Sequence, residues 1–598
     1  MRISRIAESN KNMSVTEQFV PEWAKGIVWY QIFPERFHRG DTSNDPKLID
    51  QINSWPHNQS SPYQTHPWSS DWYTRQPYEK ENGLDLSDTL QRRRYGGDLQ
   101  GVLDKLDYLE DLGIQAIYLN PLFEAPSSHK FDAATWHHID PNFGPDPDGD
   151  RKIMASETPD NPSTWKWTSA DKLFLKLVDE LHKRRMRVII DGVFNHMGLN
   201  SWVYKDLVEN QRESRFSDWM KVEKWADETE DGQTVIRTWE GYKELPEIMQ
   251  NRSGILPGPR KYIFDITRRG MDPEGNGDLS RGIDGWRLDV AFCIKHPFWK
   301  KWRKHVRSIN PEAYLLAEVI DTPKKQQPFL KGDEFDAVMN YNFAFAVSEY
   351  FIREDKPSLP SLLDRKLQEL REAYPHQVSH VMHNLLGSHD TDRVASRIAN
   401  SKLFTMRNWS QYYHKSKMVN PKYKTGKPDE DARHIQKLMV VFQLMYLGAP
   451  VVYYGDEAGL WGPNDPCNRK PMLWPELSYD NETAFPNEPG RKPEPNGFDA
   501  GLHEHHREFI RIWRANKALM TGEYRTIIAD DVSSVFGFER YFGDERLAVI
   551  FNSGVGHYEC CPEGYANAEL LFSMNAALSE NGISSIRPNG VIIIRNKS

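Results

Sequence analysis

The stretch Gly282-Ile-Asp-Gly-Trp-Arg-Leu-Asp-Val-Ala-Phe292 decides the fold of this chain. Within it, the apolar Trp286 and Leu288 alternate with charged residues, which predicts a short buried strand that carries Arg287 and ends at Asp289. Charged side chains are rarely buried unless they are paired, so we expect Arg287 and Asp289 to form an ion pair at the mouth of a barrel. Taken alone, the pair is more often a structural salt bridge than a catalytic one.

Seven other stretches predict similar short strands, and amphipathic segments lie between many of them. In chain order the predicted strands are 27–33, 115–119, 187–194, 283–290, 314–319, 337–342, 383–390 and 450–457. The predicted helices are 98–112, 297–308, 360–373 and 431–447, with another from Asp171 after a Thr168 or Ser169 cap. Alternating strands and helices indicate a parallel sheet, and eight such units predict an α/β fold, a (β/α)8 TIM barrel.

The predicted barrel is flanked and interrupted by other segments. Residues 1–22 form an extension, and 23–520 form the barrel domain, with an inserted subdomain at about 195–262, after the third strand. Residues 521–598 change to short alternating runs around Gly543-Asp544, a hairpin signal, and predict a C-terminal all-β sandwich domain.

The composition excludes several classes of function. The net charge of -9 is spread along the chain without a basic stripe, which argues against nucleic-acid binding. No apolar run is long enough for a membrane span, and the four cysteines have no zinc-ligand spacing. The first residues lack the apolar centre of a secretory signal, so we expect a cytoplasmic protein, and we expect no organic cofactor.

Three carboxylates follow predicted strands: Asp289, Glu318 and Asp390. Cleavage of a glycosidic bond needs one carboxylate as nucleophile and one carboxylic acid that protonates the leaving oxygen. Asp289 suits the first role because the neighbouring Arg287 would keep it ionised. Glu318 suits the second because its apolar neighbours would raise its pKa. Asp390 lies between two hydrogen-bond donors and suits the binding of sugar hydroxyls.

Four segments in this order resemble the signature segments of the α-amylase family of glycoside hydrolases. They are Asp191-Gly-Val-Phe-Asn-His196, Gly285-Trp-Arg-Leu-Asp289, Glu318 and Ser388-His-Asp390. The resemblance implies that Asp289 is the nucleophile, Glu318 the general acid/base and Asp390 the transition-state stabiliser. The substrate-binding residues that it implies are Asp191, Asn195, His196, Arg287, His389 and Phe131, the last of which stands where the family has a tyrosine.

Further segments resemble the cyclomaltodextrinase and neopullulanase branch of this family. They are Tyr30-Gln-Ile-Phe-Pro-Glu-Arg-Phe37, Gly96-Gly-Asp-Leu-Gln-Gly101, 120–130 and Tyr454-Gly-Asp-Glu457. The resemblance implies a retaining hydrolase of α-1,4-glucosidic bonds in malto-oligosaccharides, cyclodextrins, pullulan or starch. An α-glucan transglycosylase on the same residues is the alternative, and a non-catalytic sugar-binding protein is a weaker one.

The predicted barrel begins near residue 23, so we expect no amino-terminal β-sandwich of the kind that is usual in this branch. We therefore expect a monomer, with a dimer still open. Its cleft would be narrowed by the loops 38–95 and 121–167, in which Trp55, Trp68, Trp72, Trp165 and Trp167 either stack on glucose rings or fasten the loops.

A calcium site is the other expectation from the first long loop. The hard oxygen ligands would come from Asp41, Asn44, Asp45, Gly96 and Asp98. Arg39 stands where the family has an asparagine ligand, and its charge opposes a bound cation.

Overall fold

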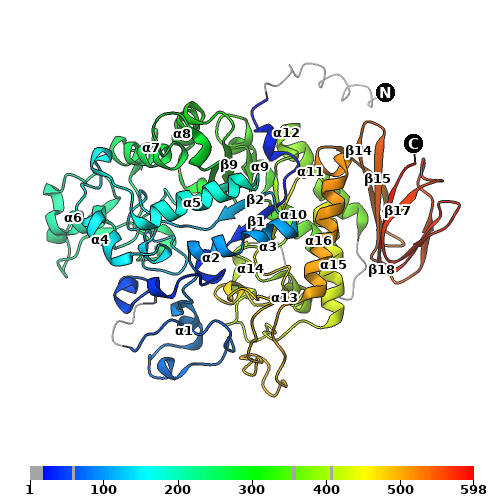
Figure 1. Cartoon of the computed structure of the whole chain (residues 1–598), viewed down its shortest axis with the longest axis horizontal. Coiled ribbons are helices and arrows are strands. Elements are labelled where there is room, and N and C mark those ends of the chain that lie inside the picture. The colour runs from blue at the N-terminus through cyan, green and yellow to red at the C-terminus, as the bar shows by residue number, and fades with distance from the viewer. Residues whose placement is uncertain (1–17, 57–60, 353–358, 405–408, 598) are drawn as a thin grey trace.

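The computed structural model describes residues 18–56, 61–352, 359–404 and 409–597. Within these ranges, an eight-stranded parallel sheet forms the centre of the larger domain, with helices around it (Figure 1). Its order is β10-β9-β8-β3-β2-β1-β12-β11, and a parallel bridge between Met339 and His383 joins the two ends and closes the barrel. The strands are β1 (Trp29–Ile32), β2 (Ala116–Leu119), β3 (Arg187–Gly192), β8 (Gly285–Leu288), β9 (Tyr314–Ala317), β10 (Ala337–Val338), β11 (His383–Leu385) and β12 (Ala449–Tyr453). The predicted TIM barrel is confirmed.

Most strands end earlier than the sequence predicts. β10 has only Ala337 and Val338, because the backbone turns at Asn340 and Tyr341 already begins α10 (Tyr341–Phe351). β11 likewise ends at Leu385, well before His389. The polar residues at these positions therefore lie in loops at the carboxyl edge of the barrel, where active groups of this fold lie.

Helices cover the outside of the barrel. They include α5 (Ser169–Lys183), α7 (Pro257–Met271), α8 (His296–Ile309), α11 (Pro360–Ala373), α15 (Glu430–Met445) and α16 (Ala500–Ala515). Thr168 caps α5, because its side chain accepts from the Asp171 amide while the Asp171 carboxylate accepts from the Thr168 amide. The predicted helix 98–112 is divided at Lys105 into α2 (Leu99–Asp104) and α3 (Leu106–Leu112).

The segment between β3 and α7 contains short elements that are not part of the barrel. They are α6 (Trp202–Asn210), β4 (Val222–Lys224), β5 (Val235–Ile236), β6 (Gln250–Asn251) and β7 (Gly254–Ile255). Each pair of these strands forms a separate two-stranded antiparallel sheet. Helix α7 begins inside the segment predicted as an insertion, but it packs against α8 as a helix of the barrel.

The C-terminal domain is an antiparallel sheet beside α15 and α16 (Figure 1). Its strands are β13 (Glu523–Asp530), β14 (Val535–Phe542), β15 (Glu545–Asn552), β16 (Tyr558–Cys560), β17 (Glu569–Leu578) and β18 (Ser584–Arg595). The predicted hairpin joins β14 to β15, with Phe542 opposite Glu545. Phe536, Phe538 and Phe551 face the barrel and surround Phe442 of α15. The opposite face has its own small core, which includes Ile550 and Ile592.

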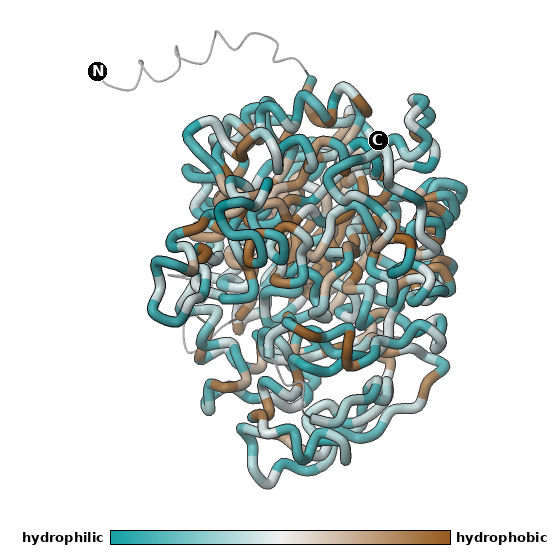
Figure 2. The backbone as a smooth tube through the Cα atoms, turned by 90° about the vertical axis from the view of Figure 1, so that its left-hand side faces the viewer, coloured by the Kyte–Doolittle hydropathy of each residue, from teal (hydrophilic) through white to brown (hydrophobic). Residues whose placement is uncertain are grey.

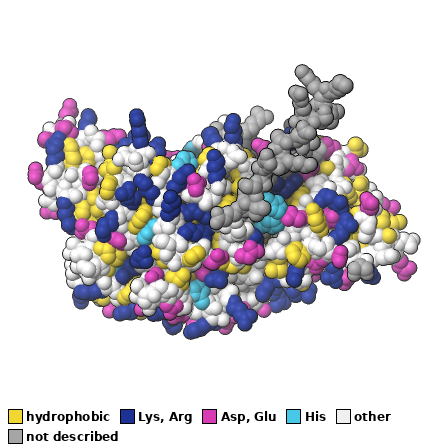
Figure 3. Space-filling model, turned by 90° about the horizontal axis from the view of Figure 1, so that it is seen from above, with side chains coloured by type: hydrophobic (Ala, Val, Ile, Leu, Met, Phe, Trp, Pro, Cys, Tyr) yellow, Lys and Arg dark blue, Asp and Glu magenta, His cyan; other side chains and the backbone are white. Residues whose placement is uncertain are grey.

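The distribution of side chains agrees with a packed globular protein. Hydrophobic segments concentrate toward the centre of the molecule in Figure 2. Positive and negative side chains are interspersed on the face that Figure 3 shows. None of the described helices has the length and the apolarity needed to cross a bilayer.

Candidate active site

The stretch around β8 positions the first carboxylate. Gly285 lies so close to β9 that a Cβ atom there would be 2.0 Å from the Tyr314 carbonyl oxygen, so only glycine allows this strand contact. Asp289 follows the strand, and Val290 then has φ 37 and ψ 47. This left-handed conformation costs a β-branched residue roughly 1–3 kcal/mol, a strain typical of functional sites. The Val290 amide donates to Glu318 Oε2 at 3.0 Å, so the turn joins two of the predicted catalytic residues.

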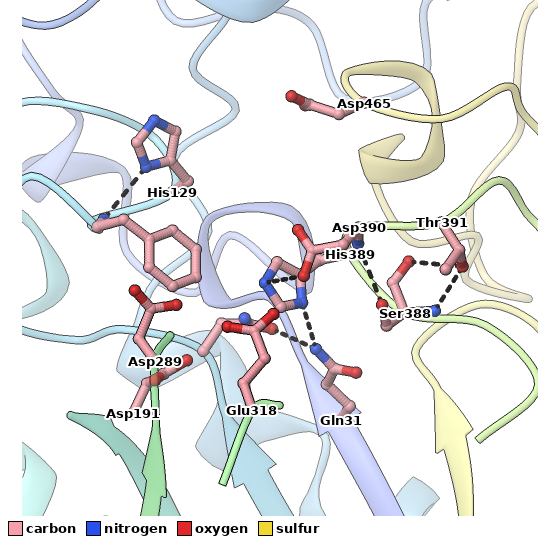
Figure 4. A network of polar contacts seen from close by, with 12 residues as sticks. Gln31, His129, Asp191, Asp289, Glu318, Ser388, His389, Asp390, Thr391 and Asp465 are labelled. Carbon is pink, nitrogen blue, oxygen red and sulfur yellow. Dashed lines mark hydrogen bonds and ion pairs between the residues drawn. The ribbon is translucent and has the colours of Figure 1, made fainter. Parts of the chain in front are cut away.

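Arg287 lies at the centre of the carboxylates. Its Nη1 is 2.8 Å from Asp191 Oδ1 and 2.9 Å from Asp289 Oδ1. Its Nη2 forms an ion pair with Glu318 Oε2 at 2.9 Å, off the direction of a hydrogen bond. The predicted pair between Arg287 and Asp289 is confirmed, and the structure adds two more acids around the same guanidinium. Figure 4 shows Asp191, Asp289 and Glu318 side by side at the strand ends.

The acids in this cluster outnumber the cation. Burial raises the pKa of Asp289 well above its usual value and that of Asp191 to about 6, against the attraction of Arg287. The expectation that Arg287 alone keeps Asp289 ionised is not confirmed, because burial and the neighbouring carboxylates outweigh it. The pKa values of Asp289 and Asp191 are therefore raised together, because burial and each neighbouring carboxylate disfavour ionisation.

Asp390 lies across the mouth from Asp289 and is connected to His389 (Figure 4). His389 Nε2 is 3.2 Å from Asp390 Oδ2, and His389 Nδ1 is 2.9 Å from Gln31 Nε2. An amide NH2 group only donates, so Nδ1 accepts and Nε2 carries the proton toward Asp390. Burial lowers the pKa of His389 well below its usual value. Burial, followed by the charge of Glu318, raises the pKa of Asp390 to about 7.

Two flat side chains line the same mouth. The ring of Phe131 is nearly parallel to that of His389, with centroids 5.4 Å apart and planes at 9°. The ring of His196 stacks on Trp239 of the inserted segment at 5.7 Å and 26°. His196 Nε2 is buried without a hydrogen-bond partner among the described residues. The Asn195 amide contacts His196 Nδ1 at 3.3 Å, so all the predicted binding residues lie around one mouth.

Sequence reasoning missed further residues at this mouth. Arg469 Nε donates to the His389 carbonyl at 3.0 Å, and its Nη2 is 3.6 Å from Asp390 Oδ1. Arg469 Nη1 also pairs with Asp465 Oδ1 at 2.9 Å. Asp465 and Arg469 lie in the irregular segment after β12. Neither hydrophobic periodicity nor the end of a predicted strand therefore indicated that they belong to the site. The only signal available was an aspartate four residues before an arginine.

The predicted calcium ligands come together but do not fit a calcium ion in this arrangement. Asp98, whose pKa burial raises to about 6, accepts hydrogen bonds from the amides of Gly40, Asp41 and Gly101 and from the Asn44 side chain. The guanidinium of Arg39 holds both carboxylate oxygens of Asp45, with Nε 2.8 Å from Oδ1. Gly96 packs against Asp45, since a Cβ atom at Gly96 would lie 2.6 Å from Asp45 Oδ1. Arg39 thus supplies the positive charge in this cluster. Calcium binding at these residues stays a prediction.

Four of the five loop tryptophans contact other residues of the described structure. Trp72 is 2% exposed and stacks on Tyr95, and the Trp68 indole donates to the Met472 carbonyl. Trp165 and Trp167 both lie under the guanidinium of Arg269. Trp55 differs in having an exposed fraction of 49%. It is the one tryptophan of the five that is open enough to stack on a sugar.

The geometry above defines a barrel hydrolase that uses carboxylates, and comparisons with known proteins give its family. The family described as "Alpha amylase, catalytic domain" matches residues 31–158, 168–249 and 276–420. Neopullulanase 2 of Thermoactinomyces vulgaris is 32% identical over 89% of this chain and 70% of its own length. A cyclomaltodextrinase of a Bacillus species is 32% identical over 91% of this chain and 76% of its own length.

Solved structures agree with this result. The ligand-free cyclic alpha-maltosyl-(1→6)-maltose hydrolase of Arthrobacter globiformis aligns with a TM-score of 0.68 and 27% identity, over 96% of this chain and 100% of that chain. A debranching enzyme of Nostoc punctiforme aligns with a TM-score of 0.66 and 27% identity, over 96% of this chain and 99% of that chain. The chain therefore belongs to the α-amylase family of glycoside hydrolases, enzymes that act on α-glucans.

Proposed function

We propose that this enzyme is a retaining hydrolase of α-1,4-glucosidic bonds, with Asp289 as the nucleophile, Glu318 as the general acid/base and Asp390 as the transition-state stabiliser. The observation that carries the proposal is the contact of one guanidinium, that of Arg287, with both Asp289 and Glu318. Two carboxyl groups that flank one bond at about 5–5.5 Å define the retaining mechanism, and we expect that separation here.

The reaction then proceeds in two displacements. Glu318 gives its proton to the glycosidic oxygen while Asp289 forms a bond to the anomeric carbon, and the leaving chain departs with that proton. The Glu318 carboxylate, held by Arg287, next takes a proton from water, whose oxygen displaces Asp289 from the anomeric carbon. Asp390 and His389 hold sugar hydroxyls as positive charge develops on the ring, and Asp191 keeps Arg287 in place.

The proposed substrates are malto-oligosaccharides and cyclodextrins rather than long starch chains. The relatives named neopullulanase and cyclomaltodextrinase support this choice. We also propose that the loops 38–95 and 121–167 narrow the mouth and so favour these shorter substrates. We further propose that the protein is monomeric, which light scattering would test, and cytoplasmic, like the Bacillus subtilis relative named intracellular maltogenic amylase.

A second candidate activity is cleavage of cyclic or branched glucans that contain α-1,6 links. It is favoured by the solved structures of the cyclic alpha-maltosyl-(1→6)-maltose hydrolase and the debranching enzyme, which align with this chain over almost the whole of both lengths. An α-glucan transglycosylase would use the same residues and would differ only in whether water or a sugar hydroxyl meets the covalent intermediate.

One set of assays tests these proposals together. Maltoheptaose, β-cyclodextrin, pullulan and soluble starch are digested in parallel, and the anomeric form of the first product is recorded by NMR. We expect α-anomeric products and a higher kcat/KM on β-cyclodextrin than on starch. β-Anomeric products would overturn the retaining mechanism, and products longer than maltoheptaose would favour the transglycosylase. Pullulan products that require α-1,6 cleavage would favour the second candidate.

A further inference from the structure

A second cluster of ligand-type side chains lies outside the catalytic mouth. His137 and His138 belong to the loop after β2, and Glu157 follows α4 (Pro147–Ala155). Glu157 Oε2 is 2.8 Å from His138 Nε2 and 3.3 Å from His137 Nε2. All three side chains are buried, with exposed fractions of at most 3%. Both imidazoles therefore aim the same ring nitrogen at one carboxylate oxygen.

The second ring nitrogen of each imidazole, Nδ1, contacts an oxygen atom of another side chain. His138 Nδ1 is 2.8 Å from Asp171 Oδ2, and His137 Nδ1 is 2.6 Å from the hydroxyl of Tyr262. The ring of His137 also stacks on Trp165 at 4.4 Å and 12°. Histidines that bind a metal commonly hold their second nitrogen in this way, with a carboxylate or another oxygen behind it.

We propose that His137, His138 and Glu157 form a binding site for Zn²⁺ that is separate from the catalytic centre. Two imidazole nitrogens and a carboxylate are a common zinc ligand set, and three protein ligands leave the fourth tetrahedral position to a water. Bonds of about 2.0–2.1 Å in that geometry place ligand atoms about 3.3 Å apart. The separations of 2.8 and 3.3 Å need little change to reach that value.

The alternative is a hydrogen-bonded cluster held by a proton. Burial lowers the pKa of His138, but Asp171 and Glu157 outweigh it and raise the pKa to about 9. Arg269 also faces the cluster, 3.1 Å from Asp171 Oδ2. The two readings differ in whether the full chain retains Zn²⁺ at these three side chains.

The position of the site indicates a structural role. The loop that carries His137 and His138 also carries Phe131 to the catalytic mouth, and Glu157 and Asp171 belong to the segment of α4 and α5, which pack together. A zinc ion here would tie the loop to these helices. We therefore expect bound Zn²⁺ to raise the melting temperature and to leave kcat within about twofold.

The first test measures zinc retention by the full chain. A second group, His376, His380 and Glu523, could also bind zinc at the boundary of the C-terminal domain, so every protein carries His376→Gln. After removal of metals, addition of ZnCl2 and gel filtration, we expect one Zn²⁺ per chain and a raised melting temperature. The further change Glu157→Gln should abolish both effects, and Glu110→Gln, at an exposed glutamate, should abolish neither. Zinc retained equally by all three proteins, or by none, would overturn the proposal.

The second test needs no change at the site and so does not depend on the folding of a variant. Co²⁺ replaces Zn²⁺ in the His376→Gln protein, and its visible spectrum reports the coordination. We expect the strong visible bands of tetrahedral Co²⁺. Weak octahedral bands, the same as those of Co²⁺ in buffer alone, would assign the cluster to hydrogen bonding alone.

Discussion

The two ends of strand β8 carry aspartates with opposite surroundings. Asp284, before the strand, meets donors only: Arg187 Nη1 at 2.6 Å, His182 Nε2 at 2.9 Å and the Val188 amide at 2.9 Å. Asp289, after the strand, shares one guanidinium with two other carboxylates and precedes a residue with strained backbone. The first carboxylate is met by donors alone, whereas the second shares its cationic partner with two other acids.

A second aspartate that precedes a barrel strand has surroundings like those of Asp284. Asp336, just before β10, lies within 3.0 Å of both Arg303 and Arg307, and it also accepts the Leu315 amide. Cations thus outnumber acids around Asp284 and Asp336, whereas acids outnumber the cation around Asp289. The comparison shows why this fold separates the residues that stabilise it from the residues that react.

Loss of the Asp289 carboxylate should have the largest effect on activity. We expect Asp289→Asn to lower kcat on β-cyclodextrin by on the order of 10⁴-fold, because the nucleophile is gone. The melting temperature should stay the same or rise, since one of the crowded acids becomes neutral. Steady-state kinetics and thermal denaturation check both parts. Near wild-type turnover would remove Asp289 from the role of nucleophile and weaken the contrast with Asp284.

Glu318 should show a milder loss that depends on the leaving group. We expect Glu318→Gln to lower kcat on maltoheptaose by roughly 10³-fold, within the usual range for a general acid. An aryl maltoside whose phenolate leaves without protonation should lose much less in the first step, and the covalent intermediate should accumulate in rapid-quench mass spectrometry. An equal loss on both substrates would show that Glu318 is not the proton donor.

Replacement of Asp284 should lower stability and leave activity nearly unchanged, the reverse of what we expect at Asp289. This is the sharpest test of the comparison. We expect Asp284→Asn to lower the free energy of unfolding by about 2 kcal/mol while kcat stays within about twofold. The loss is smaller than for a fully buried pair because Arg187 is 45% exposed. Urea denaturation and kinetics on one preparation provide the measurement. A large loss of kcat with unchanged stability would mean that the two ends of β8 are not separated in function.

The pKa of Asp390, raised to about 7 from an ordinary value of about 3.9, makes stability depend on pH. Between about pH 4 and 7 the folded state binds a proton that the unfolded state has lost, so stability falls as pH rises. Asp390→Asn should make this fall shallower, by at most about 1.4 kcal/mol per pH unit. Urea denaturation across that range compares the two proteins. A steeper fall in the variant would contradict the raised pKa.

The residues that the sequence could and could not predict differ in a physical way. Asp289, Glu318 and Asp390 were predictable because parallel strands of a barrel end at one edge, and short apolar runs mark those strands. Arg469 was not, because an irregular loop after β12 brings it back over Asp390. The raised pKa of Asp289 could not be predicted from the sequence either. It depends on how many buried acids share Arg287, which only the fold determines.

The cluster around Arg39 lies on the catalytic side of the barrel but resembles its amino-terminal end, because its carboxylates are met by donors. Arg39 and Asp45 are only partly buried, with exposed fractions of 33% and 21%, so Arg39→Asn should cost about 1 kcal/mol in metal-free buffer. The asparagine would supply an oxygen and release Asp45, so 1 mM Ca²⁺ should raise the melting temperature of this variant and leave the wild type unchanged. Arg39→Leu removes the charge without adding an oxygen, and its response to Ca²⁺ should be smaller. A wild-type protein that Ca²⁺ itself stabilises would show that the cation binds despite Arg39, and the predicted calcium site would then be real.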